Sequence, residues 1–253
     1  MPVPRRGGDI EAMAMAMAIL DELGRPVPLD LARLLQSQKL DLIERPLPEG
    51  IPGMIHLASG TIVVDPGLSA QERRLVICHE VAHAILPEHQ LALLQTPEPD
   101  LGWRQRLLLR GQANRFAATL LFGGAPDAMI ADSEVSLNAV RSLAALANAP
   151  LEAAFHRFVT RYPGRVWGLA CGMRTNGVPK RDPLATVVVP VSYALASSPA
   201  IWCGTPRIVR LPSVPAGSLD AIRPVYSRER LRRAGARSLE WTEHPHGVFV
   251  LLR

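Results

Sequence analysis

A helix with a strong start signal and two histidines one turn apart is the feature that most constrains this sequence. Ser69 and Glu72 have the spacing of a capping box, and Pro87 stops the helical pattern, so we predict a helix over residues 69–86. The segment His79-Glu80-Val81-Ala82-His83 lies inside it. Residues four apart lie about 40° apart around a helix axis, so the two imidazoles share one face. We therefore expect a buried helix that presents two histidines and an acidic side chain together.

This five-residue pattern is typical of a zinc site. His79 and His83 can hold one metal ion at about 2.1 Å, while Glu80 takes a proton from the metal-bound water. A catalytic zinc ion needs a third protein ligand, and His89 has a suitable spacing from His83. Leu86 stands where that spacing requires a glycine, so an exposed loop histidine is the favoured interpretation of His89.

The remaining pattern predicts an α+β chain of two domains. Expected helices cover 9–23, 28–38, 103–121, 136–147 and 151–159; expected strands cover 40–45, 53–57, 61–64, 166–171, 185–191, 207–211 and 248–252. We expect a mainly helical domain with a small sheet over 1–162, which includes a helical hairpin at 136–160. A smaller domain with an antiparallel sheet follows over 163–253. The strand pair before the capped helix should lie along the site cleft.

Charge and cysteine content indicate which partners and which cellular compartment suit this protein. The 253 residues hold 28 Lys+Arg against 23 Asp+Glu, a modest excess of +5 that gathers at 207–237. A solvated face is the favoured interpretation of this run, ahead of direct nucleic-acid contact. Cys78, Cys171 and Cys203 have no C-x-x-C spacing, which argues against a disulfide framework. Without a segment that resembles a membrane span or a cleavable leader, we expect a cytoplasmic protein with no membrane partner.

Several further residues have a structural interpretation. The hairpin at 148–150 could be a helix-turn-helix, with His156, Arg157 and Arg161 on its second helix, but a packed helical pair is favoured because of its wide apolar face. Cys78 is expected to be a small buried hydrophobe. The other residues considered are Asn114 and Phe116, expected to be packing elements, and His244 and His246, expected in a surface turn.

Four spaced segments resemble the ImmA/IrrE family of bacterial metallopeptidases. They are Gly60-Thr-Ile-Val-Val-Asp-Pro-Gly-Leu-Ser69, Arg73-Arg74, His79-Glu-Val-Ala-His-Ala-Ile-Leu86, and Ala113-Asn-Arg-Phe-Ala-Ala118 with Leu120-Leu121. The resemblance spans about residues 10–160. Residues 163–253 resemble more weakly the GAF-like sensor domain of some members, through Cys203-Gly204-Thr205-Pro206 and the last strand.

The resemblance implies a zincin-like domain, followed by a GAF-like α/β domain, in a zinc-dependent endopeptidase. Such an enzyme would cleave a helix-turn-helix repressor in a stress or mobile-element response. His79 and His83 would be zinc ligands and Glu80 the general base. The family's third ligand is a glutamate four residues before Asn114, where this chain has Arg110. A guanidinium offers no lone pair to a metal.

Three accounts of Arg110 remain open. In the first, Arg110 lies between the histidines and pairs with Glu80, and the protein is catalytically degenerate and acts as a regulatory binding or sensor protein. In the second, another residue is the third metal ligand. In the third, the helix register differs by a turn. No glutamate is available in any register, because the chain has no acidic residue between Asp100 and Asp127. The other candidate ligands are His89, Glu88, Glu98 and, more weakly, Gln112.

Overall fold

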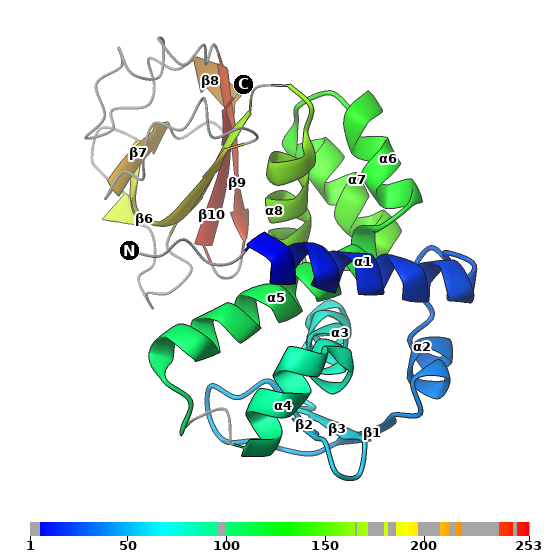
Figure 1. The fold of residues 1–253 in the computed structure, drawn as a ribbon. Coiled ribbons are helices and arrows are strands. Elements are labelled where there is room, and N and C mark those ends of the chain that lie inside the picture. The colour runs from blue at the N-terminus through cyan, green and yellow to red at the C-terminus, as the bar shows by residue number, and fades with distance from the viewer. Residues whose placement is uncertain are drawn as a thin grey trace. The chain divides into compact units, whose positions relative to one another are not determined.

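The computed structural model has a mainly helical first part and a strand-rich last part (Figure 1). It describes residues 6–95, 100–164, 166–171, 180–181, 186–196, 208–212, 216–218, 238–244 and 247–252. The chain divides into two compact units, Met1–Asp127 with Ala144–Pro150, and Ala128–Leu143 with Leu151–Arg253. The predicted α+β class is confirmed, and the domain boundary expected near residue 162 stays a prediction.

The first unit contains five helices and three strands among its described residues. They are α1 Arg6–Leu23, α2 Leu31–Ser37, β1 Asp41–Glu44, β2 Gly53–His56, β3 Thr61–Val64, α3 Ala70–Ile85, α4 Pro87–Gln95 and α5 Trp103–Phe122. Gly24, with φ 77°, follows α1 in the left-handed conformation that glycine adopts at little cost. The first helix and its end are therefore as expected.

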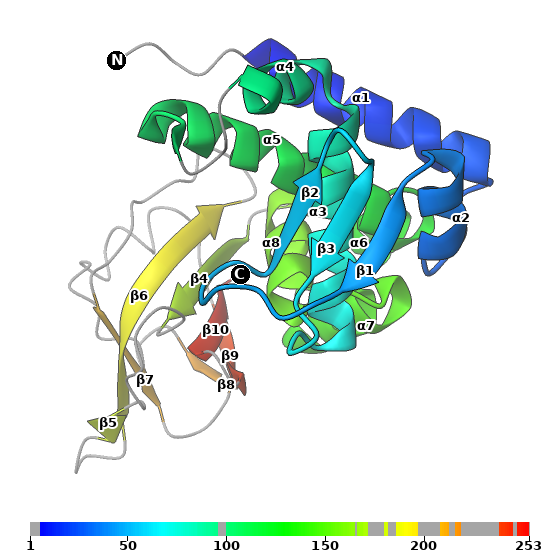
Figure 2. The same ribbon diagram turned by 90° about the horizontal axis from the view of Figure 1, so that it is seen from below.

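The three strands form one small sheet in the order β1-β3-β2. The central strand β3 pairs in parallel with β1 and antiparallel with β2, where Ile62 lies opposite Ile55. Ile62 and Val64 alternate inward and are fully buried. This inner face packs on α3 (Figure 2), so the sheet and the histidine helix share a core. The edge strand β2 also contacts α3.

Helix α5 packs between α3 and α1 in the core of the first unit. Its side chains Phe116 and Leu120 are buried together with Ile77 of α3 and Leu20 of α1. At the end of α5, Gly123 lies so close to α1 that an added Cβ would be 2.6 Å from Leu20 Cδ1. These contacts fix α5 beside the histidine helix.

Helix α4 was not predicted, since the sequence pattern indicates a loop over 90–102. Leu86 is extended, with φ −70° and ψ 120°, so it ends α3 as expected. Pro87 then occupies the first position of a new helix, where its missing N–H removes no hydrogen bond and its fixed φ suits the helix. The proline both ends one helix and begins another.

The second unit contains a sheet of seven described strands. In chain order they are β4 Trp167–Cys171, β5 Lys180–Arg181, β6 Thr186–Ala196, β7 Ile208–Pro212, β8 Ala216–Ser218, β9 Ser238–His244 and β10 Gly247–Leu252. The sheet order is β5-β6-β4-β10-β9-β8, and β7 pairs with β6. The described pairings are antiparallel, as predicted, but β5, β8 and β9 were not expected. The GAF-like resemblance stays a prediction, and Cys203 and His246 lie outside the described residues.

Three helices complete the described elements, and the first of them was not predicted. They are α6 Ala125–Asp132, α7 Leu137–Ala147 and α8 Leu151–Arg161. Phe155 and Phe158 of α8 are fully buried, and α8 packs on β4 and β6. Arg157 is only 7% exposed, so one of the three side chains considered for base reading faces the interior. Across the part of the chain that the structure describes, we find no helix with the length and apolar character to cross a membrane.

Candidate functional site

The site is built on α3, whose start is fixed by the predicted capping box. Ser69 Oγ accepts a hydrogen bond from the Glu72 backbone N–H at 3.2 Å, and Glu72 Oε2 accepts one from the Ser69 N–H at 2.9 Å. Both side chains accept hydrogen bonds from backbone N–H groups at the helix start that would otherwise have no acceptor. The capping box is thereby confirmed, and it sets where the histidine turn falls along the helix.

The two helix histidines face one another, as their spacing predicts. His79 Nε2 and His83 Nε2 are 3.2 Å apart, and the rings meet edge to face. Two ligands that bind one tetrahedral zinc ion at 2.1 Å would be about 3.4 Å apart. The separation of this pair therefore fits two nitrogens that share one metal ion.

The outer nitrogens of both rings contact further side chains. His79 Nδ1 is 2.8 Å from Asn114 Oδ1 on α5, and His83 Nδ1 is 3.0 Å from His89 Nδ1 on α4. His89 Nε2 is in turn 2.9 Å from Gln112 Oε1 on α5. The result is a chain of five side chains that joins three helices.

This chain of contacts defines the tautomers. The amide oxygens of Asn114 and Gln112 only accept, so His79 donates from Nδ1 and His89 from Nε2. His89 Nδ1 is then an acceptor, and His83 must donate to it from Nδ1. Both remaining Nε2 atoms carry lone pairs that point at one another, which is an arrangement suited to a bound cation. In metal sites the second nitrogen of a ligand histidine is held in this way.

His89 is the clearest correction to the sequence interpretation. It was expected to be an exposed loop histidine, but it lies on α4 and is 0% exposed. The reason is the helix that Pro87 opens, which turns His89 toward α3 and α5. Because its two nitrogens contact His83 and Gln112, His89 positions a neighbouring histidine and does not face the point between His79 and His83.

Burial keeps His83 neutral. Loss of water, which is the largest cause, acts together with the neighbouring His79, His89 and Arg110 to lower the pKa of His83 to about 2. A neutral imidazole is the form that binds metals. His83, at 1% exposure, is thus ready to coordinate an ion at neutral pH.

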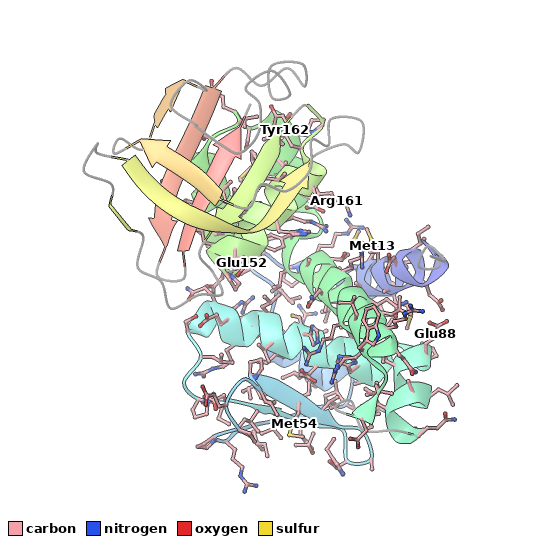
Figure 3. All side chains as sticks on the ribbon, turned by 90° about the vertical axis from the view of Figure 1, so that its left-hand side faces the viewer. Met13, Met54, Glu88, Glu152, Arg161 and Tyr162 are labelled. Carbon is pink, nitrogen blue, oxygen red and sulfur yellow. The ribbon has the colours of Figure 1, made fainter. Side chains whose placement is uncertain are left out.

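The side chain of Glu80 on α3 lies close to the edge strand β2. This side chain is 7% exposed, and an added Cβ at Gly53 of β2 would be 3.5 Å from Glu80 Cγ. The same Cβ would meet Val76 Cγ1 at 2.3 Å, so only glycine lets β2 approach α3 this closely. The predicted hairpin does pack against the site helix. Its edge strand is β2, which carries the half-exposed Met54 (Figure 3).

A third metal ligand is not found at the expected place. Arg110 is exposed, and the position of its guanidinium between the two histidines stays a prediction. Glu88 is exposed on α4 (Figure 3), and Glu98 lies outside the described residues. Within the described ranges, no three His, Cys, Asp or Glu side chains are grouped so that they could hold a metal ion. The histidine pair fits zinc, but these residues do not complete the three-ligand set of a catalytic zinc site.

Cys78 takes no part in this arrangement. It is free, fully buried and next to His79 in sequence, and burial raises the pKa of its thiol to about 12. A thiol in this state is neither nucleophilic nor a metal ligand. Its predicted role as a small buried hydrophobe is confirmed.

Sequence reasoning missed Asn114 and Gln112 as partners of the histidines. Both were visible as polar side chains two residues apart on a mostly apolar helix. Gln112 is 3% exposed, and a buried amide needs hydrogen-bond partners. What the sequence lacked was the packing of α5 on α3 and α4, which decides which polar group meets which histidine.

A capped His-Glu-x-x-His helix against a small mixed sheet is the arrangement of metallopeptidase-like domains. Residues 36–159 match the family model of M78 peptidases described as the IrrE N-terminal-like domain.

One solved structure, a Mycobacterium tuberculosis transcriptional regulator, resembles the chain in fold. The TM-score is 0.56 at 15% sequence identity, over 99% of this chain and 80% of that chain. At this identity the likeness concerns the fold alone. No curated protein matches the chain.

Proposed function

We propose that this protein is a metallopeptidase-like regulator that binds a protein partner at its histidine site and does not hydrolyse it. The observation that carries the proposal is Arg110, an exposed arginine at the position where the family resemblance expects a carboxylate ligand. A guanidinium cannot bind zinc, and its charge acts against a cation beside His83. Two histidines alone hold zinc weakly compared with a full ligand set.

The edge strand β2 supports the binding half of the proposal. It is the last strand on its side of the three-stranded sheet, and it passes Glu80. An extended polypeptide could pair with such an edge through backbone hydrogen bonds. The partner we propose is a transcriptional regulator, in particular a helix-turn-helix repressor, with a stress or mobile-element response as the setting. The strand-rich second unit would supply the sensor of that response.

A second candidate function, zinc-dependent endopeptidase, is favoured by the Nε2–Nε2 separation of 3.2 Å and by the buried Glu80. His79 and His83 would hold the ion, which would supply an activated water, and Glu80 would accept a proton. This function requires a third ligand from outside the described set, such as Glu98.

Metal analysis of the purified protein separates the two candidates. We expect less than one zinc per chain in protein purified without added metal, and no cleavage of a co-expressed repressor. Arg110→Glu should raise zinc affinity, because it completes a two-histidine, one-carboxylate set. His79→Ala in the Arg110→Glu background is the matched control, and it should abolish that gain.

Stoichiometric zinc in the native protein, together with repressor cleavage that is lost in Glu80→Gln, would overturn the binding proposal and establish the endopeptidase. A repressor that co-purifies intact with both the native protein and Glu80→Gln would support the binding proposal.

A further inference from the structure

We infer that one exposed face of α5 is a docking surface for a protein segment that carries acidic and bulky apolar side chains. The face consists of Trp103, Leu107, Arg110 and Asn114, which we term the α5 stripe. This inference rests on the proposed function, since it names the chemistry of the partner that the histidine site would bind. The argument has three parts: helix geometry, exposed apolar area and charge.

The spacing of these four residues places them on one helix face. Steps of four, three and four residues keep side chains in line along a helix. All four side chains are exposed, Trp103 by 63% and Leu107 by 64%. Asn114 contacts His79, so the α5 stripe begins at the histidine pair and extends outward for about 16 Å.

Trp103 and Leu107 place exposed apolar area on one face of α5. Large apolar side chains that are exposed one turn apart commonly mark interaction sites. Tryptophan is also among the residues most enriched in binding hot spots.

The charged side chains of α5 itself have one sign. The chain has no acidic residue from 101 to 126, whereas α5 carries Arg104, Arg106, Arg110 and Arg115. Arg104 stacks on the Trp103 ring at 5.3 Å, and Arg115 pairs with Asp9 at 3.1 Å. A complementary partner would place carboxylates beside the arginines and apolar side chains on Trp103 and Leu107.

A polypeptide fits this surface better than a nucleic acid does. Phosphates would use the arginines but leave Leu107 in water, since an aliphatic side chain offers no stacking face for a base. Trp103 and Arg110 are seven residues apart, about 10 Å along the helix. An extended chain covers that distance in about three residues. The expected motif therefore has a bulky apolar residue and an acidic residue three positions apart.

Fluorescence anisotropy with two labelled peptides tests the inference. The first is a 15-residue peptide with repeated Leu-x-x-Glu, and the second has Lys in place of each Glu. The full-length protein is used in EDTA, so the readout depends neither on metal nor on hydrolysis. We expect saturable binding of the Glu peptide, weakened about tenfold by Trp103→Ala and by Arg110→Gln. Arg110→Glu should reverse the preference in favour of the Lys peptide.

Matched controls come from the same unit. Arg33→Gln on α2 and Ile43→Ala on β1 change exposed residues away from the α5 stripe and should leave binding unchanged. The inference is overturned if the stripe variants bind the Glu peptide as the native protein does. Duplex DNA that displaces the peptide through these residues would also overturn it, as would a chain dimer that Trp103→Ala dissociates without any peptide binding. Cleavage of a repressor would refute the binding-only function but leave this surface intact.

Discussion

His89 contacts a side chain through each of its ring nitrogens, and it links Gln112 of α5 to His83 of α3. Replacing His89 with alanine would leave the buried Gln112 amide without its contact at 2.9 Å. We expect His89→Ala to lower the free energy of unfolding by about 1–3 kcal/mol. In the Arg110→Glu background it should also weaken zinc binding about ten- to hundredfold, because His83 loses the partner that fixes its tautomer.

Urea unfolding and competition with a chelator measure the two effects of His89→Ala. His56→Ala, at an exposed histidine, is the control. A His89→Ala protein with native stability and unchanged zinc affinity would show that the contact to His83 has no positioning role.

Asp65 gives a pH-dependent prediction at a single residue. Its carboxylate accepts hydrogen bonds from the backbone N–H of Leu47 at 2.9 Å and of Gly67 at 2.7 Å, and these lower the pKa of Asp65. A lowered folded-state pKa means that the contribution to stability is present above the unfolded-state pKa and is lost as the pH falls through the folded-state pKa.

We therefore expect Asp65→Asn to be less stable than the native protein at pH 6, with a difference that shrinks toward pH 3. Urea midpoints at several pH values provide the measurement, with Asp132→Asn on α6 as an exposed control. A difference that stays constant with pH would contradict the role of the Asp65 charge.

At the scale of single residues, the sequence predicts how side chains are arranged when their residues lie close together in the chain. His79 and His83 are set by helix periodicity alone, and the structure brings their side chains together as expected. His89, Asn114 and Gln112 depend on how three helices pack, and no local pattern encodes that. Arg110 lies on the predicted helix and is exposed, and for the same reason its place relative to the two histidines stays a prediction.

Among the elements, the contact of α5 with α1 depends on a glycine. A Cβ at Gly123 would lie 2.6 Å from both Leu20 Cδ1 and the Thr119 carbonyl oxygen. The carbonyl oxygen belongs to the backbone and cannot move aside cheaply. We expect Gly123→Ala to lower the free energy of unfolding by about 1–3 kcal/mol.

The matched control for Gly123→Ala is Gly102→Ala at the other end of the same helix, where a Cβ meets nothing within 4 Å. Its effect should stay within about 0.5 kcal/mol. Thermal unfolding followed by circular dichroism compares the two, and equal effects would show that the helix contact tolerates a methyl group.

Elements with a local start or stop signal were predictable. The capping box at Ser69 and the glycine after α1 placed two helices correctly. The helix α4 was missed because Pro87 was interpreted only as a stop, although a proline can also open a helix. Strand β9 was missed because its sequence Ser-Leu-Glu-Trp-Thr-Glu-His is polar, and its pairing with β10 is a tertiary contact.

At the scale of the whole molecule, the first unit is not one continuous segment. Residues Ala144–Pro150 join it after an excursion through Ala128–Leu143, and Ala147 and Ala149 are buried. We expect a chain that ends after Tyr162 to unfold cooperatively, whereas a chain that ends after Asp127 should be markedly less stable because it lacks these contacts. Circular dichroism melts of both compare them, and equal melting temperatures would contradict the contribution of Ala144–Pro150.

The interleaving of the two units also has a consequence for biosynthesis. Domains commonly fold from the N-terminus while the ribosome is still translating, at about 5–20 residues per second. In this protein the histidine helix and all three strands beside it are synthesised before Asp127, yet the last piece of their unit follows sixteen residues of the other one. The nascent chain must therefore hold its first unit incomplete until Pro150 leaves the exit tunnel, and during that interval it presents buried surface to chaperones.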